Sequence, residues 1–314
     1  MAKFLIIGPI TKDVNIYNGI TESAVGGAVY YESFVFENLN VDHVILTTLN
    51  MEDWNLLNDF PNKDNVLAVI KDETLIFENE YLNDSQRIQK SNFANIPITL
   101  SNFNAVNVDI DEFDAILLNP LVLTDLDMDL LRYLNESGLP VFLSLQGLLR
   151  EKSEGGRVRQ VKPNVLEDIL DYVDVLFLDV YEAQFLYPDL SAGDAARELA
   201  SLGPNEVIIT QNKEGSLIYR NDEDKLYDID AYDVKEKISP TGAGDTYMAA
   251  YVIKHMENED AAKCADFASK VAALKLETEG PFDKTWDDAA QTFGMCFVVY
   301  IALTLFSKLR NKNK

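Results

Sequence analysis

Cysteine and histidine are almost missing from this 314-residue sequence. The two cysteines, Cys264 and Cys296, and the two histidines, His43 and His255, lie far apart along the chain. Two cysteines are not a disulfide framework, and isolated histidines indicate neither a zinc site nor a Ser/His triad. If the protein is an enzyme, its catalysis must therefore rest on carboxylates and backbone groups. The start of the chain has no signal-peptide pattern, so a reducing cytoplasm is the expected location.

Basic residues are also in short supply, because 27 lysines and arginines stand against 52 aspartates and glutamates, giving a net charge of −25. Such a charge repels the phosphates of nucleic acid and of anionic lipids, so nucleic acid is not an expected partner. No proline- or glycine-rich linker divides the chain, and we expect one domain over residues 1–292. The 14 residues of the apolar stretch 293–306 are fewer than the roughly 20 needed to cross a bilayer. Membrane insertion is therefore not the favoured role of the apolar, then basic, tail 293–314.

Short apolar runs alternate with longer amphipathic runs along most of the chain. Each short run is almost continuously apolar, as expected for a parallel strand that is covered on both faces. The alternation is typical of βαβ units, so we predict an α/β protein with a mostly parallel central sheet flanked by helices. The predicted strands are 3–8, 43–48, 114–119, 139–145, 173–179 and 205–210, and the predicted helices include 28–39, 125–137, 164–173 and 191–203.

Residues 65–100 interrupt this rhythm. Apolar and polar side chains alternate there with no helical segment between the strands, which favours an antiparallel ribbon. Together with residues 11–21, this ribbon is predicted to form a small sheet that projects over one edge of the main domain. Such a sheet can act as a lid that excludes water from a site beneath it.

The segment SPTGAGD, residues 239–245, precedes a run that suits a helix. Glycines have no Cβ atom, so Gly242 and Gly244, on either side of Ala243, would let an anion approach the unpaired N–H groups at the helix start. Asp245 would then lie beside a bound phosphate, where a carboxylate is costly unless it accepts a proton from an attacking hydroxyl. An ordinary turn is the alternative interpretation, with Asp245 stabilising the positive end of the helix dipole.

SPTGAGD resembles the C-terminal signature of the PfkB, or ribokinase-like, carbohydrate kinases, and further motifs follow the family's order over about residues 3–290. The resemblance implies a Rossmann-like sheet with a β lid, and Asp245 as the general base. In GPITKD, Asp13 is similar to the aspartate that holds substrate hydroxyls. The glycine pair at Gly26 and Gly27 resembles the pair beneath the substrate. Arg87 in the lid segment could reach a polar substrate group, although a solvated lid cation explains it equally well.

The resemblance also implies ATP and Mg²⁺ as cofactors. DVYE resembles the family's N-x-x-E motif, which assigns Asp179 and Glu182 to magnesium, mainly through water. TQNKEG resembles a nucleotide-contacting segment, and the nucleotide-binding residues implied here are Thr210, Asn212, Gly215 and Thr241.

Three positions depart from the family pattern. Tyr31 stands where a substrate-side asparagine is usual, Asn212 replaces a glycine of the nucleotide loop, and Ser239 replaces the aspartate that opens the signature. That aspartate lies near a monovalent-cation site in several relatives, so potassium activation is in question. A non-catalytic regulatory protein of the same fold therefore stays open as an alternative.

The expected acceptor is a small neutral polyol, either a sugar or a cyclitol. The candidate substrate segments contain only Lys12 and Arg87 as cations, and a phosphorylated acceptor would need a larger cluster. A nucleoside is the nearest alternative, because its base could stack on the tyrosines Tyr30, Tyr31 or Tyr81. Pairing of the lids of two copies is the expected route to a homodimer.

Overall fold

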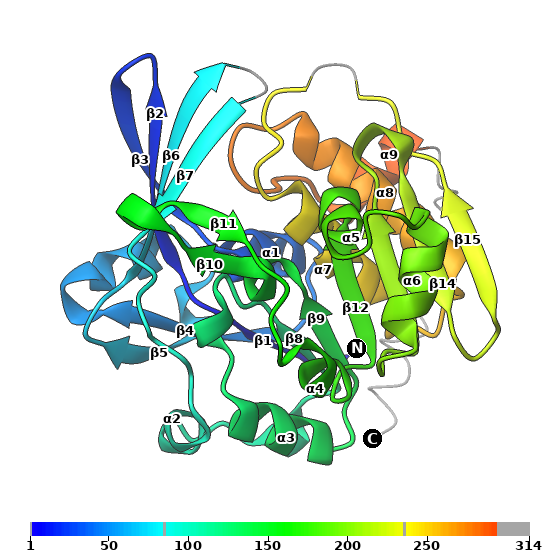
Figure 1. Ribbon diagram of the computed structural model, residues 1–314, viewed down its shortest axis with the longest axis horizontal. Coiled ribbons are helices and arrows are strands. Elements are labelled where there is room, and N and C mark those ends of the chain that lie inside the picture. The colour runs from blue at the N-terminus through cyan, green and yellow to red at the C-terminus, as the bar shows by residue number, and fades with distance from the viewer. Residues whose placement is uncertain (1, 84–85, 235–236, 294–314) are drawn as a thin grey trace.

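A nine-stranded, mostly parallel sheet forms the centre of the molecule in the computed structural model, which describes residues 2–83, 86–234 and 237–293 (Figure 1). The strand order is β15-β14-β13-β12-β9-β8-β1-β4-β5. All pairings are parallel except those of β14 with its two neighbours. All six predicted strands are confirmed. The strands are β1 (Phe4–Ile7), β4 (His43–Asn50), β5 (Val66–Lys71), β8 (Ala115–Leu118), β9 (Val141–Ser144), β12 (Val175–Asp179), β13 (Glu206–Thr210), β14 (Ser216–Arg220) and β15 (Lys225–Ile229).

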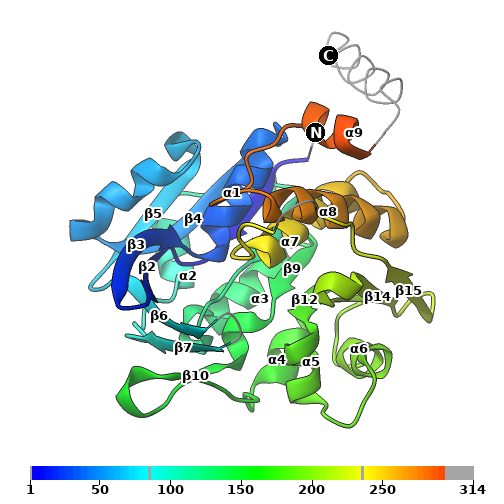
Figure 2. The same cartoon turned by 90° about the horizontal axis from the view of Figure 1, so that it is seen from above.

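Helices cover both faces of this sheet (Figure 2). Because side chains alternate along a strand, Phe4 and Ile6 of β1 pack into one apolar layer, and Leu5 and Ile7 pack into the other. The first layer contains α1 (Ala28–Asn38), α7 (Ala243–His255), α8 (Ala261–Leu276) and α9 (Trp286–Phe293). The second contains α2 (Leu100–Ala105), α3 (Met128–Glu136), α4 (Leu166–Leu170), α5 (Val180–Leu186) and α6 (Ala192–Ala200).

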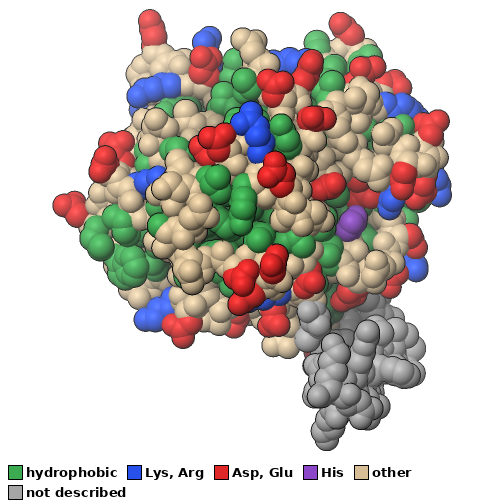
Figure 3. All heavy atoms as spheres, turned by 90° about the horizontal axis from the view of Figure 1, so that it is seen from below, with side chains coloured by type: hydrophobic (Ala, Val, Ile, Leu, Met, Phe, Trp, Pro, Cys, Tyr) green, Lys and Arg blue, Asp and Glu red, His purple; other side chains and the backbone are tan. Residues whose placement is uncertain are grey.

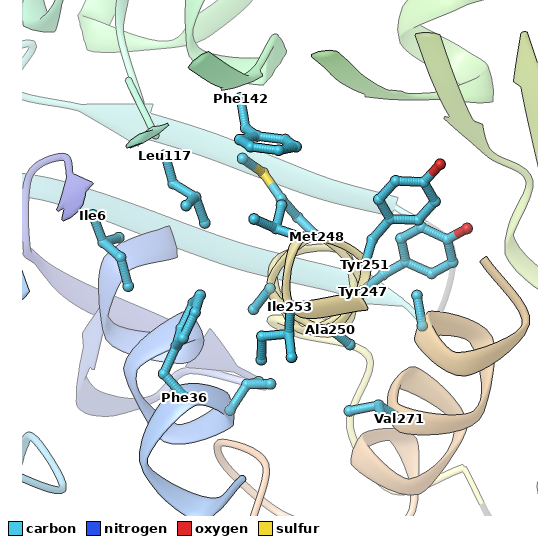
Figure 4. Packing of buried hydrophobic residues seen from close by; sticks show 14 of the residues in the cluster. Ile6, Phe36, Leu117, Phe142, Tyr247, Met248, Ala250, Tyr251, Ile253 and Val271 are labelled. Carbon is cyan, nitrogen blue, oxygen red and sulfur yellow. The ribbon is translucent and has the colours of Figure 1, made fainter. Parts of the chain in front are cut away.

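Helix α7 is buried over most of its length. Every residue from Thr246 to Ile253 is buried, as expected for a helix that is apolar around its whole circumference. Figure 4 shows its side chains between Phe36 of α1 on one side and Val271 of α8 on another, with Phe142 of the sheet nearby. The start of α7 is therefore held in place by packing on several sides.

A second sheet projects from the main body, with the order β3-β2-β6-β7 (Figure 1). Its strands are β2 (Thr11–Tyr17), β3 (Ile20–Gly26), β6 (Leu75–Asn83) and β7 (Gln86–Ser91). We refer to these four strands as the lid sheet. Beside it lies a short ribbon of β10 (Arg150–Lys152) and β11 (Val158–Gln160), which meets β7 through a bridge between Arg157 and Lys90.

The predicted lid differs from the observed one in four respects. Residues 66–71 form β5, the edge strand of the central sheet, and residues 92–99 form no strand. Strand β3 was not predicted, and β2 pairs with β6 in parallel although the other two pairings are antiparallel. The alternating pattern failed here because an edge strand of either sheet is half-exposed and produces the same alternation.

None of the helices in the described residues is long and apolar enough to cross a membrane. The stretch 293–306, the basic residues after it and Cys296 lie outside those residues, apart from Phe293 at the end of α9. Cys264 is a buried free thiol. On the face seen in Figure 3, basic side chains lie among acidic ones.

Candidate active site

The loop before α7 depends on glycine at one position. Gly242 is the N-cap of α7 and has a left-handed backbone, with φ of 78°. A Cβ atom there would lie 2.2 Å from Cδ1 of Tyr31, so glycine is required both by conformation and by space. A Cβ atom at Gly244 would meet nothing within 4 Å, which leaves room for a ligand above the helix start. The N–H of Ala243 donates to the carbonyl of Pro240 at 3.1 Å and so closes the turn.

Asp245 lies in the first turn of α7 and is half-buried. Burial raises the pKa of its carboxyl to about 6, against the opposing effect of the positive charges of Arg150 and Lys275. A carboxylate with such a pKa is mostly ionised at neutral pH and binds a proton more readily than an ordinary aspartate. The side chain is thus suited to accept a proton from a hydroxyl group.

Asp13 faces this region from β2. Its Oδ1 accepts a hydrogen bond from Thr11 Oγ1 at 2.8 Å, and a Cβ atom at Gly26 would lie 2.4 Å from its Oδ2. A side chain at position 26 would therefore collide with the Asp13 carboxylate, and glycine avoids this. Burial raises the pKa of Asp13, although Thr11 and the charges of Arg150 and Arg87 act in the opposite direction. Gly27 begins α1 with φ of 97°.

Tyr31 lies close enough to Asp13 and Asp245 to be influenced by the charges of both carboxylates. Its ring packs on Gly242, and its pKa is raised first by burial and then by the negative charges of Asp13 and Asp245. Tyr81 of the lid sheet also raises the pKa of Tyr31. A phenol group thus lies where the family pattern has an asparagine, between Asp13 of the lid sheet and the start of α7.

Arg150, the first residue of β10, is a site residue that the sequence analysis missed. The charges of Glu182, Asp245 and Asp13 all act on it, as does that of Arg87, which is exposed on β7. The Arg150 guanidinium lies over the Phe77 ring at 5.2 Å and donates to the Leu121 carbonyl at 3.3 Å. Burial lowers its pKa to about 10, which still leaves it charged at neutral pH. Its one sequence signal is a lone arginine that ends the apolar segment SLQGLLR.

The sequence analysis also missed a buried polar pair beside Asp245. Glu32 of α1 is fully buried, and its Oε2 accepts a hydrogen bond from Asn119 Nδ2 at 2.6 Å. Burial and the charge of Asp245 raise the pKa of Glu32 well above its usual value. Lys12, by contrast, does not supply a free cation, because its Nζ pairs with Asp53 Oδ1 at 2.7 Å.

The two residues assigned to magnesium form a reciprocal cap at the start of α5. The Asp179 side chain accepts from the Glu182 N–H, and the Glu182 side chain accepts from the Asp179 N–H, both at 2.8 Å. Burial and Asp179 raise the pKa of Glu182 to about 7, with the Arg150 charge opposing them. Among the residues described, no group of three or more His, Cys, Asp or Glu residues could hold a metal. One oxygen of each carboxylate is outside the cap, which suits a Mg²⁺ ion held through water and substrate phosphates.

The predicted nucleotide residues form a separate group at the end of β13. Thr210 is the register partner of Asp179 on β12, so the nucleotide group and the magnesium residues are neighbours. Asn212 has a left-handed backbone with φ of 54°, a conformation that asparagine adopts more readily than most residues. Gly215 ends the turn into β14, and a Cβ atom there would lie 1.9 Å from the Ile229 carbonyl. Thr241 is exposed in the loop before α7.

Helix α7 connects the predicted nucleotide residues to Asp245. The Ser216 hydroxyl, which follows Gly215, lies 2.7 Å from the hydroxyl of Tyr247, two residues after Asp245. The carboxyl ends of the parallel strands and the start of α7 thus meet at one edge of the sheet, where α/β proteins commonly bind ligands.

Comparison with known proteins agrees with this arrangement. Residues 149–288 match the sequence model of the pfkB family carbohydrate kinases. A nucleoside kinase of Methanothermobacter thermautotrophicus is 37% identical over 115 residues, which are 37% of this chain and 35% of that protein. A ribokinase of Bacillus subtilis is 24% identical over 167 residues, which are 53% of this chain and 50% of that protein. The chain therefore spans half or less of the length of these curated relatives.

The solved structures extend the likeness to the fold of nearly the whole chain. A pyrophosphate-dependent kinase in the ribokinase family, complexed with a pyrophosphate analog and myo-inositol, superposes with a TM-score of 0.78. The match covers 92% of this chain and 99% of that one at 22% identity. The fold is thus ribokinase-like, as predicted.

Proposed function

We propose that the protein is a kinase that transfers the terminal phosphoryl group of ATP to a hydroxyl of a small sugar or cyclitol. The observation that carries this proposal is the position of Asp245. It follows a left-handed glycine at the start of a buried helix, its pKa is about 6, and its charge acts on Tyr31 together with that of Asp13. The proposed kinase unit is residues 1–292, and no role is assigned to the tail 293–314.

In the proposed reaction, the acceptor hydroxyl gives its proton to the Asp245 carboxylate as its oxygen forms a bond to phosphorus. The bond between that phosphorus and the bridging oxygen breaks, and ADP leaves with the electron pair. First-turn N–H groups of α7 have no partner within the helix, so that of Gly244 is assigned to the oxygens of the transferring group. Asp13 would accept hydroxyl protons of the substrate, and the lid sheet would exclude water.

Asp179 and Glu182 would hold a magnesium ion through water, and that ion would neutralise phosphate charge. Arg150 adds a fixed positive charge between these two residues and Asp245, and it favours the ionised form of the base. The nucleotide is assigned to the group of Thr210, Asn212 and Gly215, with Thr241, because these residues border Asp179.

The acceptor class is tested with a panel of substrates under saturating ATP. We expect the kcat/KM for myo-inositol, ribose or fructose to exceed the values for fructose 6-phosphate, adenosine and cytidine. A preference for a nucleoside or for fructose 6-phosphate by more than about tenfold, near 1.4 kcal/mol, would contradict the polyol proposal. If the protein phosphorylates none of these compounds, a regulatory binding role becomes the better explanation.

A nucleoside acceptor is the second candidate. Tyr31 and Tyr81 lie on the acceptor side of the site, and aromatic rings of this kind can stack on a base. One face of Tyr81 is already covered by Tyr17, whose ring is stacked on it with centroids 4.5 Å apart. The relative that is 37% identical is named as a nucleoside kinase, which adds weight to this candidate.

A homodimer formed through the lid sheet is a further prediction. Tyr17, Ile20 and Leu82 of this sheet are exposed to 44%, 66% and 54%, although each is a large apolar side chain. Pairing of two lids would remove them from water. Light scattering at high protein concentration should give twice the monomer mass, and Ile20→Lys should lower it. A monomeric mass for the parent protein would refute the prediction.

A further inference from the structure

Lys275 is a charged side chain within the apolar layer that contains α7 and α8. It is the penultimate residue of α8, and its exposed fraction is 0%. Its neighbours on the same stripe of the helix, Cys264, Ala268 and Val271, are all buried and apolar or nearly so. Removing an ammonium from water is unfavourable, and an apolar side chain would fill such a position without that cost. Packing therefore does not explain a lysine here.

The Lys275 ammonium is directed at the loop that leads into the candidate active site. Its Nζ donates to the carbonyl of Ser239 at 3.0 Å. The adjacent Leu276 carbonyl accepts from the N–H groups of Ile238 at 2.8 Å and Ser239 at 3.4 Å. The end of α8 thus fixes this loop only three residues before Gly242, the residue whose left-handed backbone starts α7.

The charge of Lys275 also reaches the proposed base. Burial lowers the pKa of Lys275, and the negative charges of Asp245 and Asp283 oppose that effect. In return, Lys275 is one of the two cations that lower the pKa of Asp245. The other, Arg150, lies on the side of the lid sheet and Glu182. Asp245 is therefore influenced by one cation in the site and one behind the loop.

We propose that Lys275 is a positioning residue whose buried ammonium serves as a built-in monovalent cation beneath the anion-binding loop. This inference rests on the proposed kinase function. The ammonium fixes the Ser239 carbonyl, and with it the path of residues 239–242 into α7. Its field favours the ionised form of Asp245 and offsets the negative charge that a phosphoryl group brings to the helix start. Because this cation is covalently attached, turnover should not depend on dissolved monovalent ions.

The test compares Lys275→Ala, which leaves a cavity, with Lys275→Met, which keeps most of the volume without the charge. We expect both to lower kcat by roughly 10²-fold, the usual cost of one lost electrostatic contact, with a smaller change in KM for ATP. The acid limb of the rate profile should move to higher pH. Ammonium or potassium chloride should restore Lys275→Ala by about tenfold or more, relative to choline chloride, but should not restore Lys275→Met. Lys263→Met, an exposed lysine on the same helix, is the control and should match the parent protein.

A second measurement does not depend on turnover. Crystals of Lys275→Ala grown with rubidium chloride should show anomalous scattering beside the Ser239 carbonyl, and crystals of the parent protein should show none there. If the parent phosphorylates no acceptor but rubidium binds the variant as expected, the kinase proposal fails while the cation role of Lys275 stands. A parent enzyme that potassium stimulates more than about tenfold, or that binds rubidium at Ser239, would overturn the inference even if neither variant folds. Full activity of Lys275→Met with an unmoved acid limb would overturn it as well.

Discussion

Replacing Asp245 with asparagine is expected to lower kcat by about 10²–10⁴-fold, the range found for removal of a general base. The amide has nearly the size of the carboxylate, so the start of α7 should keep its geometry. It cannot take the proton of the acceptor hydroxyl, however, so the proposed transfer step would lose its base. Steady-state rates with the best acceptor measure the loss, and calorimetric titration with ATP should show that nucleotide binding is retained.

The matched control for this change is Asp194→Asn. Asp194 is also an aspartate in the first turn of a helix, α6, but it is exposed and pairs with Arg197. The Asp194→Asn substitution should leave turnover unchanged. In the parent protein the rate should rise with pH through about 6, because the proposed base, Asp245, accepts a proton only in its ionised form. Normal turnover of the Asp245→Asn enzyme would show that the base lies elsewhere.

The position of Asp245 was predictable because its signal is local. Glycine at 242 is needed by a left-handed backbone, and the apolar run after it forms a buried helix, so a few neighbouring letters encode both the turn and the helix. The same holds for Asn212, where asparagine adopts the left-handed conformation in place of the family's glycine. The alternation of apolar runs likewise predicted the central sheet, since burial on both faces leaves a direct pattern in the sequence.

Other parts of the site depend on contacts between distant segments. Arg150 reaches Asp13 and Asp245 only because β10 starts beside the lid sheet, and nothing near residue 150 in the sequence indicates those partners. Tyr31 and Gly242 are far apart in the chain yet touch in the fold.

Asp179 and Glu182 illustrate a different limit of prediction from sequence. An acidic pair three residues apart suits a helix cap as well as a magnesium motif. In the structure the two side chains form the cap of α5.

Arg150 is expected to be nearly as important as Asp245, although it takes no proton. Its guanidinium is the positive charge shared by Asp13, Asp245 and Glu182, and the removal of an opposite charge favours the protonated form of a carboxyl group. Arg150→Met keeps an unbranched apolar side chain over the ring of Phe77 but has no charge. We expect kcat/KM at neutral pH to fall by roughly 10²–10³-fold, as for the loss of one charge-stabilising donor.

The pH dependence separates this electrostatic role from a loss of packing. In the Arg150→Met enzyme the pKa of Asp245 should rise, so the acid limb, near pH 6 in the parent, should move to higher pH and part of the lost rate should return at alkaline pH. Arg150→Lys keeps a charge and should recover part of the rate with a smaller displacement of the limb. Arg159→Met is the control, because Arg159 lies on the partner strand β11 and pairs with Glu151 at the surface. Rates measured between about pH 5 and 9 decide the matter, since a damaged fold would lower the whole profile without moving its acid limb.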